Sequence, residues 1–176
     1  MKKFLPLLLL LVGSLFIFSC KDDDDDYVPV EVDYPAVYDV NLNLTQIATN
    51  NYGYNQPFNR PMLGQDIVLV YRKSNPGESG SIWAPLPKKY YFGSEDMDYT
   101  FDFTTTDVQL DLLANFDLSA QNASFKNTYL NGQTFRIVLV PAVYGNKNAN
   151  TSDLSKMSYE EVIAKYKIDD SKVGTL

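Results

Sequence analysis

The side chains able to do chemistry are few in this sequence, and their types exclude several kinds of site. The 176 residues contain no histidine and a single cysteine, Cys20. Ser-His-Asp and Cys-His nucleophilic sites, histidine-ligated or cysteine-clustered metals and an intrachain disulfide are therefore excluded. The sequence also lacks Gly-x-Gly-x-x-Gly, a phosphate-binding loop and Ser-x-x-Lys, so no cofactor is expected.

Carboxylates are the remaining candidates for catalysis or metal binding. Glu95, Asp96 and Asp98 cluster at a predicted turn before a strand, and Ca²⁺ uses oxygen ligands on turns. Their spacing matches no EF-hand, so a solvated acidic turn is the favoured interpretation. A glycosidase needs two carboxylates about 5 to 10 Å apart, and the fifteen acids of residues 34–176 cannot be sorted into such a pair. We therefore predict neither a metal site nor an enzyme.

The stretch of residues 50–60 (Asn-Asn-Tyr-Gly-Tyr-Asn-Gln-Pro-Phe-Asn-Arg) is rich in aromatic rings and amides and almost free of charge. It predicts a loop, and loops carry function more often than scaffold does. Rings that stack on sugars and amides that bind hydroxyl groups make Tyr52 and Tyr54, with Trp83, the candidate ligand-binding residues. The alternative is a structured connection whose rings fold back onto the domain.

Alternation of apolar and polar residues predicts short strands through most of the chain. The segments are 38–44, 66–73, 81–92, 99–104, 108–112 and 134–140. Segment 66–73 is apolar enough to be covered on both sides, whereas Pro85 and Pro87 place 81–92 at an edge or in a bent strand pair. The spacing predicts an all-β fold, an antiparallel immunoglobulin-like β-sandwich, with a small β-barrel as the alternative.

One short C-terminal helix is predicted. Ser158 and Glu161 have the spacing of a capping box. The apolar residues that follow on one face are Tyr159, Val162, Ile163 and Tyr166. We expect this helix to cover one end or one edge of the sandwich, because an open edge invites pairing with another chain.

The N-terminus carries a targeting signal. Lys2 and Lys3 precede an apolar run over residues 4–18, which is typical of a secretory signal peptide and short of the roughly 20 residues that span a membrane. Residues 15–20 (Leu-Phe-Ile-Phe-Ser-Cys) resemble the lipobox of bacterial lipoprotein precursors, with Phe18 where that pattern has a shorter residue. The resemblance implies that Cys20 is lipidated and becomes the mature N-terminus in the outer membrane.

An acidic run follows Cys20 directly: Lys21, Asp22, Asp23, Asp24, Asp25 and Asp26. Five adjacent carboxylates repel one another and keep their hydration, so they predict a solvated tether. The run also resembles the export tag of surface-exposed lipoproteins of the Bacteroidota, which implies display on the cell exterior. Residues 1–33 hold seven acids and three bases, whereas residues 34–176 hold fifteen and twelve, so the acidity is concentrated in the tether.

These observations divide the chain into four parts: a signal peptide at 1–19, the lipidated cysteine and acidic flexible tether at 20–34, a β-sandwich domain at 35–146, and a short helix and tail at 147–176. The formal charge of −7 argues against a nucleic-acid partner. We expect a lipid-anchored, non-catalytic binding or structural display module that meets an unknown envelope protein through a sheet edge or loop. The alternative is a glycan-binding accessory lipoprotein beside an outer-membrane uptake system.

Overall fold

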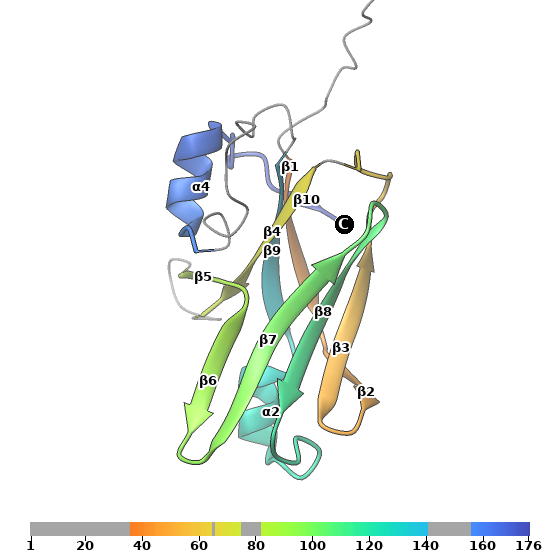
Figure 1. The fold of residues 1–176 in the computed structure, drawn as a ribbon, viewed down its shortest axis with the longest axis vertical. Helices are drawn as coiled ribbons and strands as arrows, with labels where there is room; N and C mark the ends of the chain where they lie inside the picture. Colours follow the sequence, from red (N-terminus) through yellow and green to blue (C-terminus); the bar gives the residue numbers. More distant parts are fainter. Residues whose placement is uncertain (1–35, 65, 75–81, 141–155) are drawn as a thin grey trace, which may run out of the picture. The chain divides into compact units, whose positions relative to one another are not determined.

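The computed structural model describes residues 36–64, 66–74, 82–140 and 156–176 (Figure 1). The predicted signal peptide, Cys20 and the acidic run lie outside these residues. The described residues form ten strands and two helices. The all-β prediction is therefore confirmed.

The strands form two five-stranded sheets. Sheet A has the order β10 (Gly174–Thr175), β1 (Ala36–Leu42), β9 (Gln133–Val140), β4 (Ile67–Lys73) and β5 (Trp83–Pro85). Sheet B has the order β2 (Thr45–Ala48), β3 (Asn51–Pro57), β8 (Asp107–Ala114), β7 (Glu95–Phe103) and β6 (Lys88–Phe92). Only β1 and β10 pair in parallel within the described part. Because both sheets are open, the alternative of a small closed barrel is wrong.

The core lies between the two sheets. Leu110 and Leu112 of β8 are buried in one cluster with Phe135 and Ile137 of β9, so the inner faces of the sheets pack against each other. Alternate residues of β8 are buried, as the period of two in its sequence predicts. Burial of these apolar side chains is the main term that stabilises the fold.

Strand β4 is buried on both faces, which confirms the prediction for segment 66–73. Val68 and Val70 belong to the core between the sheets. Leu69 and Tyr71 point the other way, into a second apolar cluster on the outer face of sheet A. An element outside the sheet must therefore cover that face.

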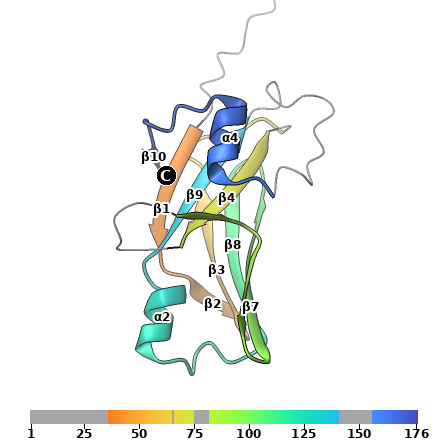
Figure 2. The same ribbon diagram turned by 90° about the vertical axis from the view of Figure 1, so that its left-hand side faces the viewer.

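Helix α4 (Tyr159–Tyr166) provides this cover (Figure 2). The capping box of Ser158 and Glu161 is present as predicted, and Tyr159, Val162 and Tyr166 are buried in the second cluster. The helix lies on a face of sheet A, not at one end or edge as the sequence suggested. The reason is that β4 and β9 carry apolar residues on both faces.

A second helix, α2 (Ala123–Tyr129), makes the prediction of one helix wrong. Asn122 accepts a hydrogen bond from the backbone N–H of Phe125 at 2.9 Å and caps it. Phe125 and Tyr129 pack against the core between the sheets. Seven residues with one apolar pair at i, i+4 are too weak a pattern to read, and the helix depends on this packing.

The segment predicted as a loop is largely a strand. The predicted loop at 50–60 is mostly β3, whose residues Asn51–Pro57 pair with β8 along their whole length. This ladder of backbone hydrogen bonds needs no apolar alternation, so the sequence did not reveal it.

Segment 81–92 is the predicted bent pair, with β5 at the edge of sheet A and β6 at the edge of sheet B.

The edge strands are poor templates for another strand. β2 has four residues and an irregular register against β3 between Gln46 and Ala48, and β10 has two residues. β5 has three residues and ends at Pro85, while Lys88 and Lys89 charge β6. Short strands, irregularities, proline and lysine are the devices that block edge-to-edge association. Neither helix of the described part is long and apolar enough to cross a membrane.

Two leucines of β8 test this arrangement. Leu110 is buried in the core, whereas Leu113 is 45% exposed on the opposite face of the same strand. We expect Leu110→Ala to lower the free energy of unfolding by about 2–5 kcal/mol, and Leu113→Ala to change it by less than about 0.5 kcal/mol. Urea unfolding followed by circular dichroism measures both, and equal losses would contradict the two-sheet assignment.

Candidate functional site

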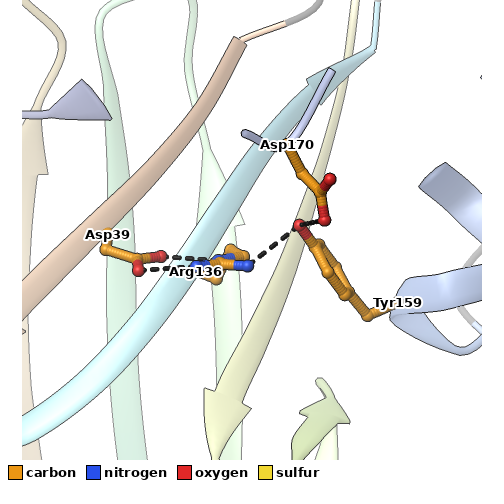
Figure 3. A network of polar contacts seen from close by, with 4 residues as sticks. All are labelled: Asp39, Arg136, Tyr159 and Asp170. Atoms are coloured by element: carbon orange, nitrogen blue, oxygen red, sulfur yellow. Dashed lines mark hydrogen bonds and ion pairs between the residues drawn. The ribbon is translucent and has the colours of Figure 1, made fainter. Parts of the chain in front are cut away.

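An arginine-centred polar cluster lies on the outer face of sheet A, beside α4 (Figure 3). Arg136 of β9 donates from Nε to Asp39 Oδ1 at 2.6 Å and from Nη2 to Asp39 Oδ2 at 2.7 Å. Its Nη1 donates to the hydroxyl of Tyr159 at 2.9 Å, and that hydroxyl donates to Asp170 Oδ2 at 3.0 Å. The cluster joins β1, β9, α4 and the segment that follows α4.

Aromatic rings enclose the same guanidinium. The carbon Cζ of Arg136 lies 4.2 Å from the ring centroid of Trp83 and 5.0 Å from that of Tyr159. Burial acts to lower the pKa of Arg136, but the hydrogen bond and charge of Asp39 outweigh it, so the pKa is raised. Because the cation is permanent and its carboxylate partner is bidentate, this pair is a strong, directional contact.

The contacts of this cluster indicate a structural role. Arg136 makes three hydrogen bonds to Asp39 and Tyr159, and a guanidinium does not lose its charge near neutral pH. Burial raises the pKa of Tyr159 to about 12, with Arg136 opposing and Asp170 adding to that shift. The phenol therefore stays neutral and acts as a hydrogen-bond relay that holds α4 on the sheet.

A second arginine, Arg72, is buried between the sheets and only 3% exposed. It donates from Nε to Gln133 Oε1 at 3.1 Å, from Nη2 to the carbonyl of Thr128 at 2.8 Å and from Nη1 to the hydroxyl of Tyr90 at 3.0 Å. Its Cζ lies 4.7 Å from the ring centroid of Tyr99. Neutral oxygens and rings thus stabilise this charge, which ties β4 to β6, β7, β9 and α2.

Sequence reasoning missed both arginines, although a signal was present. Each stands on a strand two residues from a buried apolar side chain: Val70 for Arg72 and Val138 for Arg136. A charge in such a position must find partners, because leaving it unpaired in the interior is costly. Arg72 is buried, and Arg136 is largely covered, with 13% of its side chain exposed.

The outer face of sheet B is open, in contrast to that of sheet A, which α4 covers. Strand pairing and side-chain contacts place thirteen residues on it: Ile47, Asn51, Gly53, Asn55, Lys89, Tyr91, Asp96, Asp98, Thr100, Asp102, Gln109, Asp111 and Leu113. No helix or strand of the described residues lies over them. Tyr91 is 74% exposed, and the polar side chains of this face stand on a rigid sheet.

Four of the five charged residues on this outer face are carboxylates. Lys89 lies 2.9 Å from Asp98 and 3.5 Å from Asp96. The hydrogen bond to Asp98 and the charge of Asp96 raise the pKa of Lys89, so the ammonium stays charged. Asp111 accepts from Gln109 Nε2 at 3.0 Å. Gly53 lies under the side chains of Ile47, Gln109 and Asp111, and a Cβ at this position would come within 2.6 Å of Asp111 Oδ1.

The structure does not bring the three predicted ligand-binding residues together. Tyr52 packs against the core and Tyr54 is partly exposed, and both stand on β3 of sheet B. Trp83 lies on β5 of sheet A and packs on Arg136 and the ring of Tyr159. The three rings therefore do not form one binding surface in the described structure.

The acidic cluster predicted at a turn lies at the start of β7. Glu95 is its first residue, and Asp96 and Asp98 point to the outer face with Lys89 between them. Within the described ranges, no group of three or more acidic, histidine or cysteine side chains is arranged to hold a metal ion.

Comparison with known proteins gives no relative. No protein-family model matches the chain, and no curated protein or solved structure is significantly similar to it.

The arginine cluster makes a prediction about stability. Asp39→Asn removes the charge partner of Arg136, so we expect a loss of about 1–3 kcal/mol in the free energy of unfolding. The fluorescence of Trp83, the only tryptophan, should change because the guanidinium beside its ring is no longer fixed. Lys172→Ala is the control, since this side chain is 84% exposed in its ion pair and should cost under about 1 kcal/mol. Equal losses in the free energy of unfolding would show that the Arg136 cluster contributes no more than the exposed ion pair of Lys172.

The pKa of Tyr159 makes a prediction about pH. Its ordinary value is 10.0 and its value in the fold is about 12, so neutral Tyr159 stabilises the fold fully below pH 10. That contribution is lost as the pH rises toward 12. We expect Tyr159→Phe to lose less stability than the wild type between pH 9 and pH 11, as measured by urea unfolding at each pH. A parallel loss in both proteins would refute the raised pKa.

Proposed function

We propose that this chain is a lipid-anchored, non-catalytic binding module of the outer membrane, displayed on the cell exterior, whose partner docks on the outer face of sheet B. One observation carries the proposal: helix α4 covers the outer face of sheet A, whereas nothing in the described residues covers that of sheet B. Because the edge strands are poor templates for pairing with another strand, this face is favoured over a sheet edge as the binding surface.

The anchor is supported by the residues at the N-terminus. Cys20 is the only cysteine, follows Ser19 and an apolar run, and precedes the five aspartates. Each buried methylene contributes about 0.8 kcal/mol, and two acyl chains anchor a protein stably. A lipidated Cys20 with the acidic tether would hold the domain at the membrane with its binding face free.

The immunoglobulin-like arrangement is part of the same proposal. Its support is the way the chain passes repeatedly between two sheets that are antiparallel apart from the β1–β10 pair. These crossings are β1 to β2, β3 to β4, β5 to β6 and β8 to β9. Such crossings are typical of Greek-key sandwiches. This class of domain presents binding loops on a stable scaffold, and the structural role of the arginine clusters agrees with a non-catalytic module.

A protein partner is favoured over a glycan. The aromatic residues expected to bind sugar are separated, with Trp83 packed against Arg136 and Tyr52 against the core. Tyr91 is the one strongly exposed ring on the outer face of sheet B. A flat face with one exposed ring offers little stacking surface for a polysaccharide chain.

The anchor is tested by Cys20→Ser in the native host. We expect the variant to leave the membrane fraction, whereas the wild type stays with it until detergent is added. Retention of Cys20→Ser in the membrane fraction would refute lipid anchoring.

Display on the exterior is tested with Lys172→Cys, whose position is highly exposed. A membrane-impermeant maleimide should label this variant on intact cells, and replacing Asp22 to Asp26 by alanine should abolish the labelling without releasing the protein from the membrane. The wild type is the control for labelling at Cys20. Labelling only after cell lysis would place the domain in the periplasm.

A further inference from the structure

The outer face of sheet B has an excess of negative charge. Asp96, Asp98, Asp102 and Asp111 are its carboxylates, and Lys89 is the one cation among the residues assigned to it. Lys89 contacts Asp96 and Asp98, so the charge of Asp102 and Asp111 is not balanced by it. These two carboxylates stand on the neighbouring central strands β7 and β8.

The carboxylates lie on a surface whose size approaches that of a typical protein interface. The five strands of sheet B span about 24 Å at their usual spacing, and the nine residues of β7 span about 30 Å. Their product, at most about 700 Å², approaches the about 800 Å² that each partner buries in a typical complex. Because the side chains stand on paired strands, little backbone entropy is lost when a partner binds.

Apolar side chains lie among the charges. Leu113 is opposite Asp98 in the register of β7 and β8, and Tyr91 is opposite Asp96 in that of β6 and β7. Both are exposed. Tyrosine is enriched among binding hot spots, and an interface surrounds its apolar core with a polar rim.

The sign of the charge decides between possible partners. A second copy of this chain would bring carboxylates against carboxylates, and like charges facing each other across an interface cost several kcal/mol. An anionic partner is disfavoured for the same reason. Resting on the proposed function, we propose that the outer face of sheet B docks a cationic protein surface, whose lysine or arginine side chains pair with Asp102 and Asp111 while Tyr91 and Leu113 are buried.

The experiment uses the full lipidated chain in detergent, with a poly-L-lysine of about 20 residues as the probe and poly-L-glutamate as its counterpart. The binding variant is Asp102→Asn with Asp111→Asn. The matched control removes two charges elsewhere, by Glu160→Gln on α4 with Asp169→Asn. A third variant, with Asp22 to Asp26 replaced by asparagine, measures the contribution of the tether.

We expect the binding variant to weaken the affinity for poly-L-lysine by about tenfold, because each exposed charge pair contributes modestly, and the control to change it less than about threefold. Amide shifts of the wild type on titration should concentrate in β7 and β8 and spare β1. Equal losses in the binding variant and the control would overturn the proposal, as would a loss confined to the tether variant.

Two further outcomes would also overturn it: binding of poly-L-glutamate, and binding of a neutral dextran that shifts the amides of β7 and β8, which would indicate a glycan surface. These measurements are made in detergent and do not depend on the anchor. Failure of the cationic docking is therefore distinguishable from failure of lipid anchoring, which fractionation of the Cys20→Ser variant reports.

Discussion

Strands β4 and β9 lie at the centre of sheet A and bury side chains on both faces, and much of the structure depends on this constraint. Val70 and Ile137 face sheet B, whereas Leu69 and Val138 face away from it. Exposing the second set to water would cost the free energy of several apolar side chains. Helix α4 is therefore an integral part of the domain, and sheet B is left as the one with an open outer face.

Arg72 and Arg136 show how such a fold accommodates charge. Arg136 has a bidentate carboxylate partner in Asp39 and sits at the rim of the helix contact. Arg72 is more deeply buried and is held by a glutamine, a backbone carbonyl and tyrosine rings. Each connects strands to a helix, so the position of α4 and of α2 depends on directional contacts as well as on apolar packing.

The elements with a strong local pattern were predictable. The alternation at Val108, Leu110 and Leu112 places β8 correctly, and the capping box of Ser158 places α4. Strand β3 was interpreted as a loop because its polar residues carry no alternation, and α2 was missed because its two packing residues make too weak a pattern. Both elements depend on partners that are distant in the sequence, β8 for β3 and the core between the sheets for α2.

The sequence by itself determined which chemistries are absent, where the strands with apolar alternation lie, and that one cysteine stands between an apolar run and five aspartates. Only the tertiary structure decided that α4 covers a sheet face, that Trp83 packs on Arg136 and that four aspartates share an open surface. The physical reason is that a period of two assigns each residue to one of two sides of its strand. Which side is covered depends on the strands and helices that pack there, and these come from distant parts of the chain.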